Sequence, residues 1–282
     1  MKIIDTYPEI IALLDKMGDT VDMSLHESYV RQILDGLCEK VKNDATIYDF
    51  DKDILPILDL TIRNREKLKK AHDSFLEVVQ DLSERIEAAI GMDLDVDIIL
   101  YLGLCNGAGW VTKLNTRPTV LLGIEKIIEL KWHELVEMRG LIYHELGHVW
   151  HMSVGAIFEE FESERERYIL QLYQEGIAMY FEQLMAGDFN YYHQDKNGWL
   201  DWCLSNKHEL NVEYMRRLEA DESAQDFFGD WCDYKGRSDV GYFLGCEFVK
   251  AMSEEYPFSK LLRLDVCTVY EEFQRYVRKQ CE

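Results

Sequence analysis

The sequence predicts an α+β protein that is mainly helical, with one small β-rich segment. Over most of the chain, apolar residues recur at spacings of three and four, the period of amphipathic helices. Two short apolar runs, 96–102 and 118–124, instead indicate strands, and they bracket the turn-rich segment 105–109. A chain of 282 residues can bury a sizeable core, as one large domain or as two subdomains.

The first ninety residues are expected to be helical. Residues 56–90 carry apolar side chains at helical spacing, and Gly91 follows them as a natural C-cap. We therefore expect a helical N-terminal region over 1–92 and a second domain over 93–282. Because no Ser/Pro-rich linker divides the two, one continuous domain is the alternative.

A further amphipathic helix is predicted over residues 134–152, and it contains the sequence His-Glu-Leu-Gly-His at 144–148. His144 and His148 are four residues apart, so they lie one turn apart on the same helix face. Two imidazoles placed in this way can bind a single Zn²⁺ ion. Glu145 would then act as general base toward a water that the metal activates. The competing interpretation is a core helix with two hydrogen-bonded histidines.

Catalytic zinc needs a third protein ligand, and we expect it to be Glu175. Glu175 lies in a second predicted helix, and the 26 residues of segment 149–174 leave room for a connection and a returning helix. The small residues Gly176 and Ala178 favour close helix packing there. We expect Glu182, two turns further on, to be exposed. Five glutamates nearer to His148 stand in a charged run typical of a solvated helix face, and we discount them as ligands: Glu159, Glu160, Glu162, Glu164 and Glu166.

The His-Glu-x-x-His pattern, followed by Glu-Gly-x-Ala-x-Tyr at 175–180, resembles the gluzincin metallopeptidases, which include the thermolysin-like and aminopeptidase-N-like enzymes. The resemblance covers roughly residues 96–250. It implies a zincin-like catalytic domain over 93–282, with a small antiparallel sheet above the active-site helix, a zinc ion, and a downstream glutamate ligand. The interval before that glutamate is longer here than in those families. The charged segment 158–167 accounts for the extra length, and we expect it to extend one of the helices.

The same resemblance implies an oxyanion donor and a mode of substrate binding. The segment around Tyr242 is similar to the Tyr-x-x-Gly helix that supplies this tyrosine in aminopeptidase-N-like enzymes, with Tyr234 and Tyr180 as weaker candidates. Substrates of such enzymes add as an extended strand to a sheet edge. Pro118 favours an edge position for the run 118–124. For the glycine-rich segment 105–109, we favour a plain hairpin turn over a close approach to substrate.

The remaining elements are assigned from periodicity and composition. We expect turns over 187–198, a long loop near the site over 221–236, and a final helix over 261–279. His151 follows His144 by seven residues and falls on nearly the same helix face. It is either a core histidine or a group that orients a ligand or touches the substrate.

Composition excludes several classes of protein. The formal net charge is −22, from 31 Lys and Arg against 53 Asp and Glu, which argues against nucleic-acid binding and against anionic membrane surfaces. No apolar run approaches the length of a membrane span, and the N-terminus lacks a signal-peptide core. Seven cysteines without a Cys-x-x-Cys pair indicate a reduced protein. We therefore expect a cytoplasmic location.

The sequence as a whole predicts a zinc metallopeptidase that hydrolyses peptide bonds, with peptides or proteins as substrates. His144, His148 and Glu175 would bind the metal, with Glu145 as base and Tyr242 as oxyanion donor. Two alternatives stay open: a zinc hydrolase acting on a non-peptide substrate, and a non-catalytic metal-binding or regulatory protein. The intact Glu145 favours an enzyme, because a structural or sensing site needs no general base.

Overall fold

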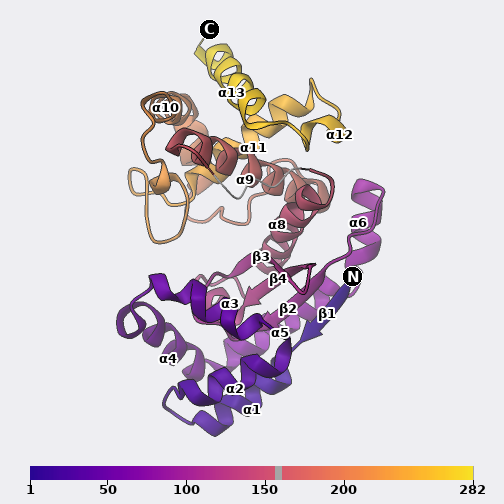
Figure 1. Ribbon diagram of the computed structural model, residues 1–282, viewed down its shortest axis with the longest axis vertical. Coiled ribbons are helices and arrows are strands. Elements are labelled where there is room, and N and C mark those ends of the chain that lie inside the picture. Colours follow the sequence, from indigo (N-terminus) through magenta and orange to yellow (C-terminus); the bar gives the residue numbers. More distant parts are fainter. Residues whose placement is uncertain (156–160, 282) are drawn as a thin grey trace. The chain divides into compact units, whose positions relative to one another are not determined.

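The computed structural model describes residues 1–155 and 161–281 (Figure 1). The chain divides into two compact units, Met1–Glu145 and Leu146–Glu282, and the division falls inside helix α8 (Leu135–Val154). Helices predominate in both units, which confirms the mainly helical α+β class.

The first unit contains a four-stranded sheet in the order β1-β2-β4-β3. Its strands are β1 (Lys2–Asp5), β2 (Asp97–Tyr101), β3 (Gly109–Leu114) and β4 (Arg117–Gly123). β2 pairs in parallel with both β1 and β4, and only β3 and β4 are antiparallel. The prediction of an antiparallel sheet is therefore wrong for two of the three pairings. β2 is buried along its whole length, as strands of parallel sheets usually are.

The tight hairpin turn lies at a different place from the one predicted. Asn115 and Thr116 join β3 to β4, and their φ angles of +49° and +69° are those of a two-residue type I′ turn. The glycine-rich segment 105–109 is instead part of the connection from β2 to β3. A local turn signal was present at both places. Which of the two segments forms the hairpin is decided by strand pairing: β4, the second strand of the hairpin, also pairs with β2 in parallel.

The expectation that Pro118 marks an edge strand is also wrong, because β4 lies between β2 and β3. The register explains why proline is tolerated there. Pairing with β2 begins at Thr119, opposite Asp97, so Pro118 pairs only with Lys113 of β3. Its missing N–H therefore breaks no hydrogen bond to β2.

Seven α-helices lie wholly within the first unit, besides a 3₁₀ turn (Ala45–Ile47) and a π-helical turn (Phe50–Ile54): α1 (Tyr7–Met17), α2 (Met23–Ile33), α3 (Leu37–Asp44), α4 (Leu55–Arg63), α5 (Arg65–Val79), α6 (Leu82–Ile90) and α7 (Ile124–Glu129). All of these α-helices except α7 are labelled in Figure 1. Segment 56–90, predicted to be helical, forms three successive helices. Asn64 separates the first two, and Gly91 caps the third in the left-handed conformation, as predicted. The expected helical region also begins with a strand, β1.

The second unit is helical in its described part. Besides the end of α8 it contains α9 (Glu164–Ala186), α10 (Trp199–Ala220), α11 (Val240–Ser253), α12 (Phe258–Leu261) and α13 (Val266–Cys281). α9 and α11 pack with backbone against backbone, since a Cβ on Gly176 would lie 2.3 Å from the carbonyl oxygen of Gly245. The turns over 187–198 and the long loop over 221–236 are confirmed, apart from one 3₁₀ turn at Gln225–Phe227. The final helix begins five residues later than predicted, at Val266 rather than 261.

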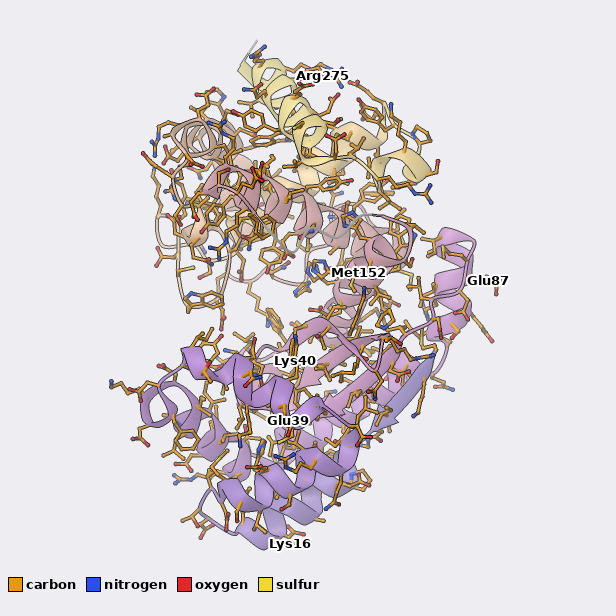
Figure 2. The ribbon with its side chains drawn as sticks, in the orientation of Figure 1. Lys16, Glu39, Lys40, Glu87, Met152 and Arg275 are labelled. Carbon is orange, nitrogen blue, oxygen red and sulfur yellow. The ribbon has the colours of Figure 1, made fainter. Side chains whose placement is uncertain are left out.

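Many acidic side chains lie at the surface beside basic ones. Two of the residues labelled in Figure 2 are examples: Glu39 pairs with Arg31, and Arg275 pairs with Glu255 and Glu272. Such exposed pairs contribute little to stability. In the described residues, no helix combines the length and apolar character that a bilayer crossing requires.

Candidate metal centre

Helix α8 carries both histidines and the glutamate of the sequence motif, as predicted. From residue 140 to residue 151 every side of this helix is buried, with His148 alone partly exposed, so the helix is enclosed rather than amphipathic there. His144 and Glu145 are each 5% exposed, and the His148 side chain is 21% exposed. Because 3.6 residues complete one helical turn, the two imidazoles project from the same face.

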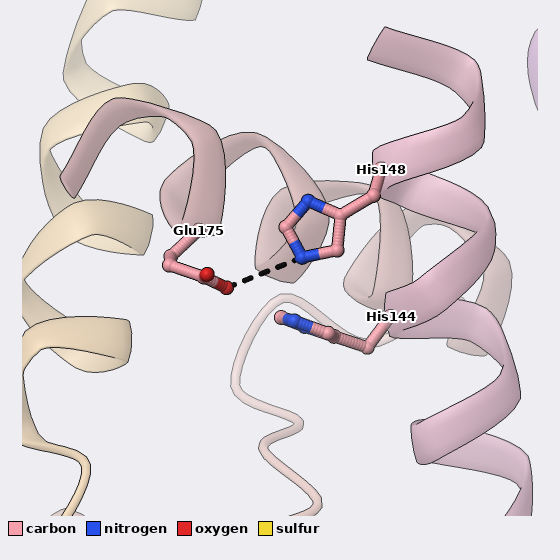
Figure 3. A group of neighbouring side chains, drawn as sticks. All are labelled: His144, His148 and Glu175. Carbon is pink, nitrogen blue, oxygen red and sulfur yellow. Dashed lines mark ion pairs between the residues drawn. The ribbon is translucent and has the colours of Figure 1, made fainter. Parts of the chain in front are cut away.

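Helix α9 brings Glu175 to these histidines. Figure 3 shows the Glu175 carboxylate pointing from α9 toward the rings of His144 and His148 on α8, and Glu175 Oε2 lies 3.3 Å from His148 Nε2. The two helices can approach because the residue before His148 is a glycine. A Cβ on Gly147 would lie 2.6 Å from the Cα atom of Ala178, closer than real Cβ contacts allow. The expectation that Ala178 permits close helix packing is therefore confirmed.

The three side chains form a group that could hold a metal ion. Each offers one ligand atom, and these atoms all lie within 4.8 Å of one another. Tetrahedral zinc holds nitrogen and oxygen ligands at about 2.0–2.2 Å, which puts two ligands about 3.3–3.6 Å from each other. The 3.3 Å separation of His148 Nε2 and Glu175 Oε2 agrees with that value. We refer to His144, His148 and Glu175 as the metal cluster; in the described part of the chain, it is the single group of three or more potential ligands found.

Of the five glutamates nearer to His148, Glu164 and Glu166 contact other residues, Glu162 is exposed, and two lie outside the described residues. Glu166 takes part in capping α9: Ser163 Oγ accepts from its N–H, and its own carboxylate accepts from the N–H of Glu162. Glu164, the first residue of α9, lies 4.0 Å from Arg167. Glu159 and Glu160 lie outside the described residues. The part of the charged segment from Glu164 onward does extend α9, as expected.

Glu145 contacts the first residue of strand β3. A Cβ built on Gly109 would lie 2.5 Å from Glu145 Oε1 and 2.7 Å from its Cγ. The carboxylate therefore rests directly on the Gly109 α-carbon, in space that only a glycine leaves open. β3 is an edge strand of the sheet, so the side chain of Glu145 and the sheet edge meet at Gly109.

The prediction that Glu182 is exposed is wrong. Glu182 is 0% exposed, and both of its oxygens bind His193: Oε2 lies 2.9 Å from Nδ1, and Oε1 accepts from the backbone N–H at 3.1 Å. His193 is itself 6% exposed. Glu182 stands two turns beyond Glu175 on α9. The sequence marks that spacing, but it contains no signal that pairs Glu182 with His193, which comes from the following connection.

Asp239 is a further acidic group near Glu175 that the sequence did not single out. It precedes α11 with φ +60°, and its Oδ1 accepts from the N–H of Gly229 at 2.9 Å. Burial raises the pKa of Asp239 to about 6, and the charges of Asp230 and Glu175 act in the same direction. The hydrogen bond from Gly229 and the nearby His193 act against this rise. The long loop over 221–236 is tied to α11 through this aspartate.

Tyr242 and His151 are not among the ligands of the metal cluster. Tyr242 stands in the first turn of α11, partly exposed, with its ring edge against Phe228 at 5.8 Å between centroids. His151 is 4% exposed and packs edge-on against the ring of Tyr173. Burial lowers the pKa of His151 to about 4, so the ring is neutral at physiological pH. These surroundings are those of a core histidine. The oxyanion role of Tyr242 stays a prediction.

Tyr180 and Tyr234, the weaker oxyanion candidates, are both buried. Tyr180 packs between Phe189 and Phe258, and the hydroxyl of Tyr234 donates to Glu209 at 3.0 Å. These contacts are typical of tyrosines in a packed interior.

The chain matches no protein-family model, no curated protein and no solved structure. The functional argument therefore depends on the chemistry of the site itself.

Proposed function

We propose that this protein is a zinc-dependent metallopeptidase of the gluzincin kind. The observation that carries the proposal is the metal cluster: two histidines on α8, the helix that also carries Glu145, and one carboxylate on α9, with their ligand atoms within 4.8 Å of one another. A donor set of two histidines and one glutamate is typical of catalytic zinc, which keeps its fourth position open. A structural zinc site would instead use four protein ligands.

Glu145 is the general base and acid in this proposal. A bound zinc ion would lower the pKa of a water molecule and polarise the carbonyl oxygen of a peptide. The water oxygen adds to the carbonyl carbon, and the Glu145 carboxylate takes the proton that the water loses. When the C–N bond breaks, Glu145 returns this proton to the leaving nitrogen, so the residue ends the cycle ionised.

The edge strand β3 supports a peptide as the substrate. One edge of β3 pairs with β4, and β3 is the last strand in the sheet order of the described chain. An extended peptide can add to such an edge through main-chain hydrogen bonds. Since Gly109 begins β3 and touches Glu145, a peptide lying along this edge would run past the proposed base. Tyr242 is proposed as the oxyanion donor, and a cytoplasmic location stays a prediction.

Replacing Glu145 with Gln tests the proposal. The amide keeps the size of the side chain but cannot take a proton, so peptide cleavage should fall by about 10²–10⁴-fold while zinc stays bound. The measurement is cleavage of a random peptide library, read by mass spectrometry, together with zinc content by elemental analysis. Glu137→Gln, on the same helix, is the matched control and should keep both.

Three outcomes separate the alternatives. Cleavage by the native protein that Glu145→Gln retains would overturn the role of Glu145. Zinc-loaded native protein that cleaves no peptide would overturn the peptidase proposal; a hydrolysis of esters or epoxides lost in Glu145→Gln would then identify a non-peptide hydrolase. Zinc binding without any hydrolysis would identify a metal-binding or regulatory protein.

A further inference from the structure

Several side chains bind the connection from β2 to β3, residues 102–108, and one of them is a buried carboxylate. We call this segment the β2–β3 loop. The hydroxyl of Tyr29 accepts from the N–H of Leu102, and Asn106 Nδ2 donates to Asp44. Glu125, in the first turn of α7, accepts from the N–H of Gly103 at 2.8 Å and from the N–H of Cys105 at 3.1 Å, using one oxygen for each. Glu125 is 0% exposed. The N–H between them, on Leu104, donates to Asn106 Oδ1 at 3.1 Å. Three successive amides are thus bound by side chains.

A carboxylate in this position carries an energetic cost. Removing an ionisable group from water disfavours its charged form, and burial raises the pKa of Glu125 to about 7 despite the two amide donors. The loop also holds Cys105 at φ +61°, in the left-handed region that side chains with a Cβ rarely adopt. Such costs persist where the surrounding structure enforces one backbone path.

The loop that Glu125 binds leads directly to Glu145. At its first end, a Cβ on Gly103 would lie 2.6 Å from Glu125 Oε1, so the carboxylate is packed onto the backbone. At its other end, the carbonyl oxygen of Ala108 accepts from the N–H of Gly123 at 3.0 Å, immediately before α7 begins. The next residue is Gly109, whose α-carbon contacts the Glu145 carboxylate. Glu125 thus contacts the first part of this short segment, and Glu145 contacts the residue that follows it.

We propose that Glu125 is a positioning residue for Glu145: it fixes the path of the β2–β3 loop so that Gly109 forms the wall on which the proposed general base rests. This inference depends on the proposed function, since it assigns Glu145 the role of base. A base must lie within hydrogen-bond reach of the proton it takes, and a displacement of about 1 Å can cost about 10²-fold in rate. The amides of Gly103 and Cys105 that bind Glu125 and the contact of Gly109 with Glu145 all belong to the first unit.

The test compares Glu125→Gln with Gly109→Ala. Gln replaces one of the two oxygens by an NH₂ group, which cannot accept from the amide that this oxygen bound. Hydrogen exchange of the amides over 102–109 should become faster in Glu125→Gln, while the zinc content stays that of the native protein. For peptide cleavage, kcat should fall about 10- to 100-fold with KM nearly unchanged. The methyl group of Gly109→Ala pushes on Glu145 from the wall itself and should give the same split between kcat and KM.

The control is Asp97→Asn, another buried carboxylate of the same sheet. Asp97 is 6% exposed and accepts from Arg117 at 2.5 Å, but it makes no contact with the β2–β3 loop among the hydrogen bonds found in the described residues. This variant should lose stability without faster exchange over 102–109 and without a change in kcat. Where Glu125→Gln fails to fold, Gly103→Ala displaces the same carboxylate from the loop side.

A coupling measurement decides the inference without any activity. If Glu125 holds Gly109 against Glu145, the methyl of Gly109→Ala costs less once the loop is released. The Tm loss of the double variant should therefore be smaller than the sum of the two single losses. Additive Tm losses, or native kcat in Glu125→Gln, would overturn the positioning role. Native protein that binds zinc but cleaves nothing would overturn the proposed function instead, and coupling and exchange would still decide whether Glu125 fixes Gly109.

Discussion

The proposed metal ligands and the surroundings of the proposed base are held in different ways. His144, His148 and Glu175 stand on two long helices, and the contact of Gly147 with Ala178 sets the separation of those helices. Glu145 stands on one of the same helices, but its carboxylate rests on Gly109, at the end of a loop bound by Glu125. Ligand geometry therefore depends on local helix geometry and one glycine contact, whereas the position of the base depends on contacts far apart in the sequence.

Gly147→Ala is the substitution expected to disturb the geometry of the proposed metal ligands most. The added methyl would meet backbone atoms of Ala178 at 2.6 and 2.9 Å, which cannot rotate away, so α9 must shift. We expect a loss of about 1–3 kcal/mol in the free energy of unfolding and a fall of about 10–100-fold in zinc affinity, because Glu175 moves with α9. Chelator competition measures the affinity, and urea titration measures the stability.

The matched control for this variant is Val136→Ala on the same helix, where the side chain is 57% exposed. It should change neither quantity beyond about 0.5 kcal/mol of stability. Native zinc affinity in Gly147→Ala would contradict the claim that the Gly147–Ala178 contact sets the ligand geometry.

A smaller effect is expected for Glu125, which binds the β2–β3 loop, and it is measured through the pH dependence of stability. Burial raises the pKa of Glu125 to about 7, whereas an unfolded glutamate titrates at about 4.3. Between these values the folded chain keeps a proton that the unfolded chain releases. The stabilising contribution is thus complete below about pH 4 and is lost as pH rises to about 7, amounting to about 1–3 kcal/mol.

Urea titrations at pH 5 and pH 7 measure this contribution as a difference between variants. The decline in unfolding free energy from pH 5 to pH 7 should be smaller in Glu125→Gln than in the native protein, and Asp97→Asn should keep the native decline. Equal declines in the native protein and in Glu125→Gln would show that Glu125 does not titrate in this range.

The arrangement of the three proposed ligands could be predicted from the sequence because it depends on local patterns. The period of 3.6 residues places His144 and His148 on one face, and the small residues beside Glu175 indicate a close helix contact. The burial of Glu182 could not be predicted in this way, since its partner His193 lies in a connection with no periodic pattern. Both carboxylate oxygens of Glu182 bind this one histidine, and nothing in the helix sequence around Glu182 indicates such a partner.

The sheet was predicted less well for a related reason. The apolar runs located β2 and β4, but strand order depends on which connection crosses the sheet and which is a hairpin. Asn115–Thr116 and the glycine-rich segment 105–109 both carry turn residues, so local chemistry alone does not choose between them. The role of Glu125 was likewise hidden, because its two amide partners lie twenty or more residues before it in the sequence.

The most direct test of the central claim is the zinc content of the dialysed protein, measured by elemental mass spectrometry in the native chain, His148→Ala and Glu175→Ala. His208→Ala, an exposed histidine on α10, is the control. Three protein ligands predict about one zinc per native chain and per control chain, and almost none in the other two variants. A native chain without stoichiometric metal, or full zinc in Glu175→Ala, would contradict the assignment of His144, His148 and Glu175 as the metal site.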